Sequence, residues 1–368
     1  MSTSRASKPI LLLGAYGRGN AGDDVFIIAA LQLFKDRTIY MNAADDSLLP
    51  PRARTSGIQT LSTVSGRDLF KKISVFLQVR HVVYWGGDLW VELYGAPRPR
   101  QLLYNMVFLN CLLRLAGKRI YYIGCGIGDL QGFSLWLARL SARMARAVTV
   151  RERRSAQILR LKQVSVLPDL AITLPYHRPA MHQRSATRPF SVVISVMHSL
   201  PDAEQTFPRL LRSIADLVNS LPPERFQVTV LPMHMSGTDV FDDLRASEAL
   251  LQHITVPIQL ADTRRSLRAT VKLLSGSHLV IGTRLHANIL AIMNATPAIG
   301  IAYRPKVRSF FTDNQLDGYV LALDQLQQLG GLFHQIIDNY EAVAEQFYRV
   351  SNRNLSQRTA YAKLISNL

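Results

Sequence analysis

Cysteine is scarce in this 368-residue chain, which has only Cys111 and Cys125. The two lie in separate apolar stretches and form no C-x-x-C pair, so neither a disulfide framework nor a cysteine zinc site is expected. Histidines and carboxylates are scattered without the spacing of a metal site, and we predict no bound metal.

Long apolar runs are also missing. The run Ile10–Ala15 is too short for an export signal, and no stretch of about 18 uncharged apolar residues predicts a membrane helix. We therefore expect a cytoplasmic protein.

Acidic residues are few as well. Lys and Arg number 43 against 26 Asp and Glu, which gives a formal net charge of +17. A charge of this size does not determine a fold, but it predicts anionic partners, among them phosphorylated metabolites, acidic glycans, a lipid surface and nucleic acid. Apolar residues make up 48% of the chain, which is enough for a packed core and excludes a disordered chain.

Short apolar runs alternate with segments of helical periodicity, which predicts an α/β fold. The runs are continuously apolar, as in parallel strands that are covered on both faces. The polar, proline-bearing stretch Leu174–Pro189 is the best break. We predict two Rossmann-like domains facing a cleft, followed by a C-terminal helix. Their predicted bounds are 1–175 for the N-terminal domain, 176–189 for a linker, 190–332 for the C-terminal domain and 333–368 for the helical segment.

Ligands of open parallel sheets bind beyond the carboxyl ends of the strands, so functional residues are expected there. The first such stretch is GAYGRGNAGDD at 14–24. Its glycines match G-x-G-x-x-G and let backbone N–H groups approach a ligand at a helix N-terminus. Asp23 and Asp24 stand where a pyrophosphate would lie, which favours a helix-capping role for them over a dinucleotide site.

Three further strand ends carry glycine or charge. WGGD at 85–88 ends in Asp88, for which a sugar contact, the positioning of a base and the capping of a helix all stay open. GCGIG at 124–128 is expected to contribute backbone only. VRERRS at 150–155 places Arg151 directly after a strand, where its guanidinium fork suits a carboxylate or a phosphate.

The strongest candidate is IGTRLHANILA at 281–291, where a strand turns into a helix. Arg284 and His286 occupy the helix start, where free backbone N–H groups and the helix dipole favour a bound anion. A histidine in this position can exchange protons near neutral pH. IAYRPKV at 301–307 adds Arg304 and Lys306 after the next strand, and PMHMSGTD at 232–239 adds His234 as a ligand contact. Together the cations predict a pocket for a small, multiply charged anion.

Taken in their order along the chain, the seven stretches resemble the polysaccharide pyruvyl transferase family over roughly residues 9–325. The resemblance implies a fold similar to that of GT-B glycosyltransferases. It also implies transfer of pyruvate from phosphoenolpyruvate to a sugar, usually as a ketal, on a cell-surface glycan or its lipid-linked precursor. Phosphoenolpyruvate would then be a co-substrate, and no cofactor is expected.

The same resemblance implies roles for individual residues. The residues implied for phosphoenolpyruvate are Arg151, Arg284, His286 and Lys306, with Leu285 counted in the same donor site. Tyr16 and Asn20 are implied for the acceptor side, and Arg18 and His234 are counted with them. Arg18 stands where relatives commonly have an apolar or aromatic residue, and it is a candidate for recognising an acidic sugar or a diphosphate.

The chemistry of the residues agrees with this assignment. Ketal formation requires a proton at the enol methylene of phosphoenolpyruvate and then attack by a sugar hydroxyl as phosphate leaves. We predict His286 as the general acid and base, and Asp88 as a second catalytic candidate that helps to activate the hydroxyl.

Two other questions stay open in the sequence. Arg139, Arg143 and Arg146 recur at helical spacing within 134–148, which fits either a solvated face or peripheral attachment to the anionic inner face of the membrane. The competing functions are a nucleotide-sugar glycosyltransferase or epimerase, a dinucleotide oxidoreductase and a basic nucleic-acid-binding protein. Nucleic acid is not expected, because the basic residues are dispersed and no nucleic-acid motif is present.

Overall fold

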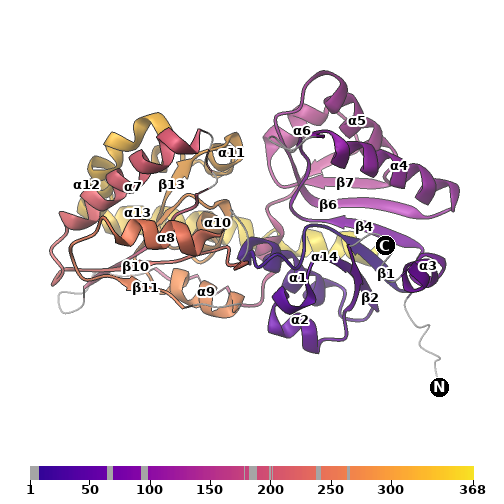
Figure 1. Ribbon diagram of the computed structural model, residues 1–368, viewed down its shortest axis with the longest axis horizontal. Helices are drawn as coiled ribbons and strands as arrows, with labels where there is room; N and C mark the ends of the chain where they lie inside the picture. Colours follow the sequence, from indigo (N-terminus) through magenta and orange to yellow (C-terminus); the bar gives the residue numbers. More distant parts are fainter. Residues whose placement is uncertain are drawn as a thin grey trace. The chain divides into compact units, whose positions relative to one another are not determined.

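The computed structural model describes residues 8–63, 69–92, 98–177, 179–181, 189–198, 200, 202–237, 242–262 and 266–368. The chain divides into two compact units, and each is built on a parallel sheet (Figure 1). The first unit comprises residues 1–18, 23–174 and 357–368, and the second comprises 19–22 and 175–356. The predicted linker, 176–189, lies in large part outside the described residues, as do Thr238 and Asp239 of the 232–239 stretch.

The sheet of the first unit has the strand order β3-β2-β1-β4-β6-β7-β8, and the short β5 pairs with β6. All of these neighbours are parallel. The strands are β1 (Ile10–Leu13), β2 (Ile39–Ala43), β3 (Gln59–Ser62), β4 (His81–Trp85), β5 (Asp88–Trp90), β6 (Arg119–Ile127), β7 (Ala147–Val150) and β8 (Val164–Val166). The helices are α1 (Ala21–Leu33), α2 (Pro51–Thr55), α3 (Leu69–Gln78), α4 (Gln101–Leu115), α5 (Gly132–Arg143), α6 (Arg153–Leu159) and α14 (Arg358–Ser366), with a 3-10 turn, η2 (Leu170–Thr173).

The sheet of the second unit has the order β11-β10-β9-β12-β13-β14, again with parallel neighbours. Its strands are β9 (Phe190–Ser195), β10 (Phe226–Val230), β11 (Gln259–Leu260), β12 (Leu279–Gly282), β13 (Ala298–Ala302) and β14 (Val320–Ala322). Its helices are α7 (Ala203–Asn219), α8 (Asp243–Leu251), α9 (Leu267–Ser275), α10 (Leu285–Met293), α11 (Pro305–Asp313), α12 (Leu329–Asp338) and α13 (Tyr340–Leu355).

The α/β fold with two Rossmann-like sheets is confirmed. The continuously apolar runs form parallel strands, and β4 and β12 are buried along their whole length because helices cover both faces of each sheet. The C-terminal region holds three helices, α12 to α14, where one was expected.

The last helix, α14, belongs to the first unit. The buried Tyr361 donates its hydroxyl to the carbonyl of Pro168 at 2.7 Å, and Arg358 Nε donates to the carbonyl of Ile172 at 2.7 Å. Helix α14 therefore fixes the segment around η2, which carries Asp169, a residue of the candidate site.

The buried His81 is expected to make the stability of the fold depend on pH. The ring of His81 stacks on Tyr121, with ring centroids 5.7 Å apart. Burial lowers the pKa of His81 to about 4, and the charges of neighbouring arginines add to the effect. These arginines are Arg37, Arg119, Arg80 and Arg146.

An unfolded histidine has a pKa of about 6.5, so between pH 6.5 and 4 the unfolded chain binds a proton that folded His81 does not. This contribution to stability is therefore lost as the pH falls through that window. At about pH 5 we expect it to cost the wild type about 1–2 kcal/mol in the free energy of unfolding relative to neutral pH, and His81→Phe to lack this component. Urea titrations at several pH values test this. His253→Phe, at an exposed histidine, should keep the wild-type profile, and an unchanged profile in His81→Phe would contradict the assignment.

Candidate functional site

In the second unit, the predicted residues follow strands that end at one edge of the sheet. Gly282 at the end of β12 pairs in register with Ser195 of β9 and with Gly300 of β13. Arg284, Leu285 and His286 come directly after β12, and His234 follows β10. Parallel strands therefore bring these residues to a common edge.

Arg284 is held by a buried carboxylate. It is the last residue before α10, with an extended backbone. Its Nε lies 2.9 Å from Oδ2 of Asp243, and its Nη2 lies 2.6 Å from Oδ1, so the contact is bidentate. The Asp243 side chain is fully buried, and its Oδ2 also accepts the backbone N–H of His234 at 3.0 Å. Burial raises the pKa of Asp243, and Arg284 acts in the opposite direction. Asp243 thus ties Arg284 to the His234 segment.

The glycine-loop residues 19–22 belong to the second unit. Asn20 forms an antiparallel bridge with His234, and the N–H of Ala21 donates to the carbonyl of Met233 at 2.8 Å. Asn20 Oδ1 accepts the N–H of Gly22 at 2.8 Å at the start of α1. The cap of α1 is therefore Asn20, and the expectation that Asp23 or Asp24 would cap it is wrong.

His286 lies against this loop. A Cβ on Gly22 would overlap Nδ1 of His286, so the loop backbone passes directly beside the imidazole, and only glycine allows that approach. His286 is half-buried in the first turn of α10. The structure thus gathers His286, Arg284, Asn20 and His234 in one neighbourhood.

Two other donor-site candidates lie at the same edge. Leu285 is buried and packs into the core. Lys306 is half-buried in the first turn of α11, with Nζ 5.8 Å from the ring centroid of Tyr303. The exposed Arg304 approaches the same ring at 5.8 Å. Because β13 pairs with β12, Lys306 comes one strand along the sheet from Arg284.

In the first unit, Arg151 forms a buried ionic cluster. Its Nη2 lies 2.5 Å from Oδ1 of Asp88 and its Nη1 lies 3.2 Å from Oδ2 of Asp169, while its side chain is only 4% exposed. Burial opposes the charge of Arg151, but the carboxylates of Asp88, Asp169 and Glu152 outweigh it and raise the pKa of Arg151. A Cβ on Gly126 would overlap Oδ1 of Asp88, which explains that glycine.

The cluster revises the expectations for Asp88. Asp88 begins β5, so the helix-capping alternative is wrong. Its side chain remains 21% exposed, which leaves a surface for a ligand contact. Sequence reasoning missed Asp169, whose Oδ1 accepts the N–H of Ala171 in the η2 turn at 2.9 Å.

Tyr16 is buried, and its hydroxyl donates to the carbonyl of Trp85 at 2.6 Å. This placement suits a side chain that supports the end of β4 better than one that touches an acceptor. Arg18 is exposed on the loop. Cys125 is buried, and burial raises the pKa of its thiol, as expected of a packing residue.

The candidate residues therefore form two groups. Tyr16, Arg18, Asp88 and Arg151 belong to the first unit, and the second unit holds Asn20, His234, Arg284, Leu285, His286 and Lys306. Among the described residues, no group of three or more His, Cys, Asp or Glu could hold a metal ion.

Comparison with known proteins agrees with the sequence motifs. A family model described as polysaccharide pyruvyl transferase matches residues 20–305. The amylovoran biosynthesis protein AmsJ of Erwinia amylovora is 23% identical, over 92% of this chain and 94% of that protein.

Solved structures establish the fold. A putative UDP-N-acetylglucosamine 2-epimerase of Listeria monocytogenes has a TM-score of 0.63 at 13% identity, over 94% of this chain and 92% of its own. Anabaena HepE in complex with UDP-glucose has a TM-score of 0.63 at 12% identity, over 98% of each chain. MurG of Acinetobacter baumannii has a TM-score of 0.56 at 15% identity, over 98% of this chain and 100% of its own. The predicted GT-B-like fold is thus confirmed.

Proposed function

The chain belongs to the polysaccharide pyruvyl transferase family, and we propose that it moves the pyruvyl group of phosphoenolpyruvate onto a sugar as a ketal, with release of phosphate. The acceptor we propose is a cell-surface polysaccharide or its lipid-linked precursor. The observation that carries the proposal is the start of α10, where His286 and Arg284 lie beside the loop 19–22.

The donor carries close to three negative charges, and this edge of the sheet offers the matching groups. Arg284 presents a guanidinium whose orientation Asp243 fixes, but the pair is neutral as a whole. Net positive charge therefore comes from Lys306, and the N-terminal ends of α10 and α11 add the positive ends of their helix dipoles. We assign the phosphate and carboxylate of the donor to these groups.

His286 is the proposed acid and base. Its imidazolium gives a proton to the methylene carbon of phosphoenolpyruvate, which becomes a methyl group, and positive charge develops at the central carbon. A sugar hydroxyl attacks that carbon, and the neutral imidazole accepts the hydroxyl proton. The C–O bond to phosphate then breaks, and a second hydroxyl closes the ketal. Of the two hydroxyl protons released, one replaces the proton taken from His286, and the other leaves with phosphate.

In the first unit, Asp88 is the proposed contact for the acceptor hydroxyl, and Arg151 holds it in place. Asn20, His234 and Arg18 remain the proposed acceptor-side residues. Direct contact of Arg151 with the donor also remains a prediction.

Phosphate release from phosphoenolpyruvate tests the function directly. The purified protein is incubated with phosphoenolpyruvate and a panel of lipid-linked and aryl glycosides, and products are identified by mass. We expect acceptor-dependent phosphate release together with a pyruvylated glycoside.

Because the HepE structure contains UDP-glucose, a parallel reaction offers UDP-sugars without phosphoenolpyruvate. Nucleotide release in that reaction, with no pyruvylated product in the first, would contradict the proposal and favour a nucleotide-sugar glycosyltransferase or epimerase.

A further inference from the structure

Exposed large hydrophobic side chains concentrate on three helices of the first unit. Thirteen such side chains are present among the described residues, and ten of them lie on α3, α4 and α5. We call these ten the α3–α5 apolar surface: Leu69, Phe70, Ile73, Leu77, Tyr104, Phe108, Leu112, Leu115, Phe133 and Trp136. Phe70 and Leu115 are 89% and 86% exposed, so the feature is not a marginal one.

The three helices cover one core. Val75 of α3, Leu103 of α4 and Leu137 of α5 are buried in the same cluster. Helices α4 and α5 lie side by side (Figure 1). Lys118, just after α4, reaches the end of α3: its Nζ lies 4.8 Å from the ring centroid of Phe76 and donates to the carbonyl of Val79, the residue after the helix, at 2.8 Å. Each of these helices therefore already buries one apolar face in the core, as an amphipathic helix does. The apolar residues on the outward faces need a separate explanation.

Outward aromatic side chains of α4 and α5 contact one another. The ring centroid of Phe133 lies 6.2 Å from that of Tyr104 and 5.3 Å from that of Trp136. Along α4, Tyr104, Phe108, Leu112 and Leu115 recur at intervals of four, four and three residues and share one face. Helix α4 is therefore apolar on both sides, although it lies at the surface.

The charge on these helices has a single sign. Their residues, 69–78, 101–115 and 132–143, include no Asp or Glu. The cations are Lys71, Lys72, Arg114, Arg139 and Arg143. Lys71 also donates to the carbonyl of Thr60 at 2.8 Å, and Arg139 donates to the carbonyls of Ile158 and Leu159 at the end of α6 at 3.0 Å each. The basic face predicted from Arg139, Arg143 and Arg146 is thus interrupted, and the apolar residues are the dominant feature.

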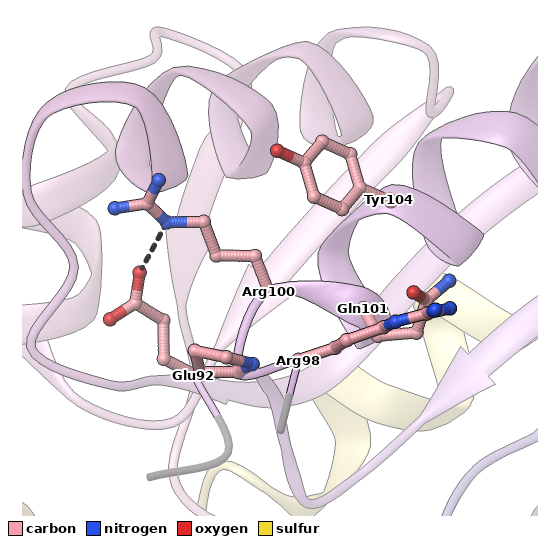
Figure 2. A pocket seen from close by; sticks show the side chains of 6 residues that line it. Glu92, Arg98, Arg100, Gln101 and Tyr104 are labelled. Atoms are coloured by element: carbon pink, nitrogen blue, oxygen red, sulfur yellow. Dashed lines mark hydrogen bonds and ion pairs between the residues drawn. The ribbon is translucent and has the colours of Figure 1, made fainter. Parts of the chain in front are cut away.

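A pocket of about 340 Å³ that charged side chains help to line adjoins the apolar surface at Tyr104. Figure 2 shows Arg98 and Arg100 at this pocket, with Nε of Arg100 3.1 Å from Oε1 of Glu92. The pocket gives the apolar surface a basic edge near the start of α4.

We propose that the α3–α5 apolar surface docks the protein on an anionic lipid bilayer. Aromatic and leucine side chains would enter the headgroup region while the lysines and arginines meet lipid phosphates, as in helices that lie in the membrane interface. No helix in the described part of the chain is long and apolar enough to cross a membrane. A second copy of the chain fits less well, because a two-fold contact between these helices would bring cations together with no carboxylate from the same helices to pair with them.

Vesicle flotation tests the proposal without any enzymatic activity. The full chain is mixed with phosphatidylcholine vesicles or with vesicles that also contain phosphatidylglycerol, at low and high salt. We expect binding to the anionic vesicles that weakens at least tenfold at high salt. Phe108→Ser/Leu115→Ser should weaken binding at least tenfold, and Lys71→Gln/Lys72→Gln about fivefold for each lysine.

Matched controls are Val166→Ser and Leu260→Ser, at exposed apolar residues outside the surface, which should bind as the wild type does. Circular dichroism and size-exclusion chromatography check the fold and the oligomeric state of every variant. Two results would overturn the proposal: no binding to anionic vesicles at low salt, or unchanged vesicle binding of Phe108→Ser/Leu115→Ser. If the wild type self-associates and Phe108→Ser/Leu115→Ser becomes monomeric but still binds vesicles, the surface joins two copies of the chain and the proposal is wrong.

Discussion

His286→Gln is expected to lower the turnover of pyruvyl transfer by about 10²–10⁴-fold. Glutamine keeps a polar side chain of similar reach but cannot exchange a proton at the donor methylene. The half-buried imidazole lies at the start of α10 beside the backbone of Gly22, so the substitution leaves the core of the second unit unchanged. The initial rate of phosphate release at saturating phosphoenolpyruvate and acceptor measures the loss, and urea denaturation checks that stability is retained.

The loop beside His286 supplies a companion variant. Gly22→Ala places a Cβ where Nδ1 of His286 now lies, so the imidazole must move, and turnover should fall although no reacting group is removed. His253→Gln, at an exposed histidine, is the control and should retain wild-type turnover. Turnover of His286→Gln near the wild-type value would remove His286 from the chemistry, while product formation by the wild type would still support the proposed function.

The sequence predicts those parts of the site that depend on local order. Arg284 and His286 follow an apolar strand and begin an apolar helix, and the structure places them at the end of β12 and the start of α10. The parallel sheets are likewise predictable, because most of the runs are continuously apolar, as strands covered on both faces must be, and this hydrophobicity is a property of the run itself.

The partners of these residues depend on long-range packing and escape a sequence pattern. Asp243 meets Arg284 only because the fold brings the start of α8 to the start of α10, and Asn20 bridges His234 from more than 200 residues away. Asp169 is positioned by α14, which returns from the end of the chain. A lone aspartate at the start of a helix or turn carries a capping signal that many aspartates share, so nothing in its sequence context marks it as an arginine partner.

Arg151→Met is expected to lower the free energy of unfolding by about 3–5 kcal/mol, because it leaves two carboxylates at a buried site without their shared cation. Asp169 is almost fully buried, and Asp88 is 21% exposed. Arg154→Met is the matched control: Arg154 pairs with Asp129 at a largely solvated site, so its loss should cost less than about 1 kcal/mol. Urea denaturation at neutral pH measures both variants.

A purely structural role and a donor-binding role for Arg151 predict different donor KM values once the lost stability is restored. Removing the stranded charges as well, in Arg151→Met/Asp88→Asn/Asp169→Asn, should restore part of the lost stability, because the penalty arises from unpaired carboxylates. If Arg151 also binds phosphoenolpyruvate, the KM for the donor should stay raised in this stabilised triple variant relative to Asp88→Asn/Asp169→Asn. A destabilisation of Arg151→Met no larger than that of Arg154→Met would contradict the buried cluster, whereas recovery of stability together with an unchanged KM would make Arg151 a positioning residue for Asp88.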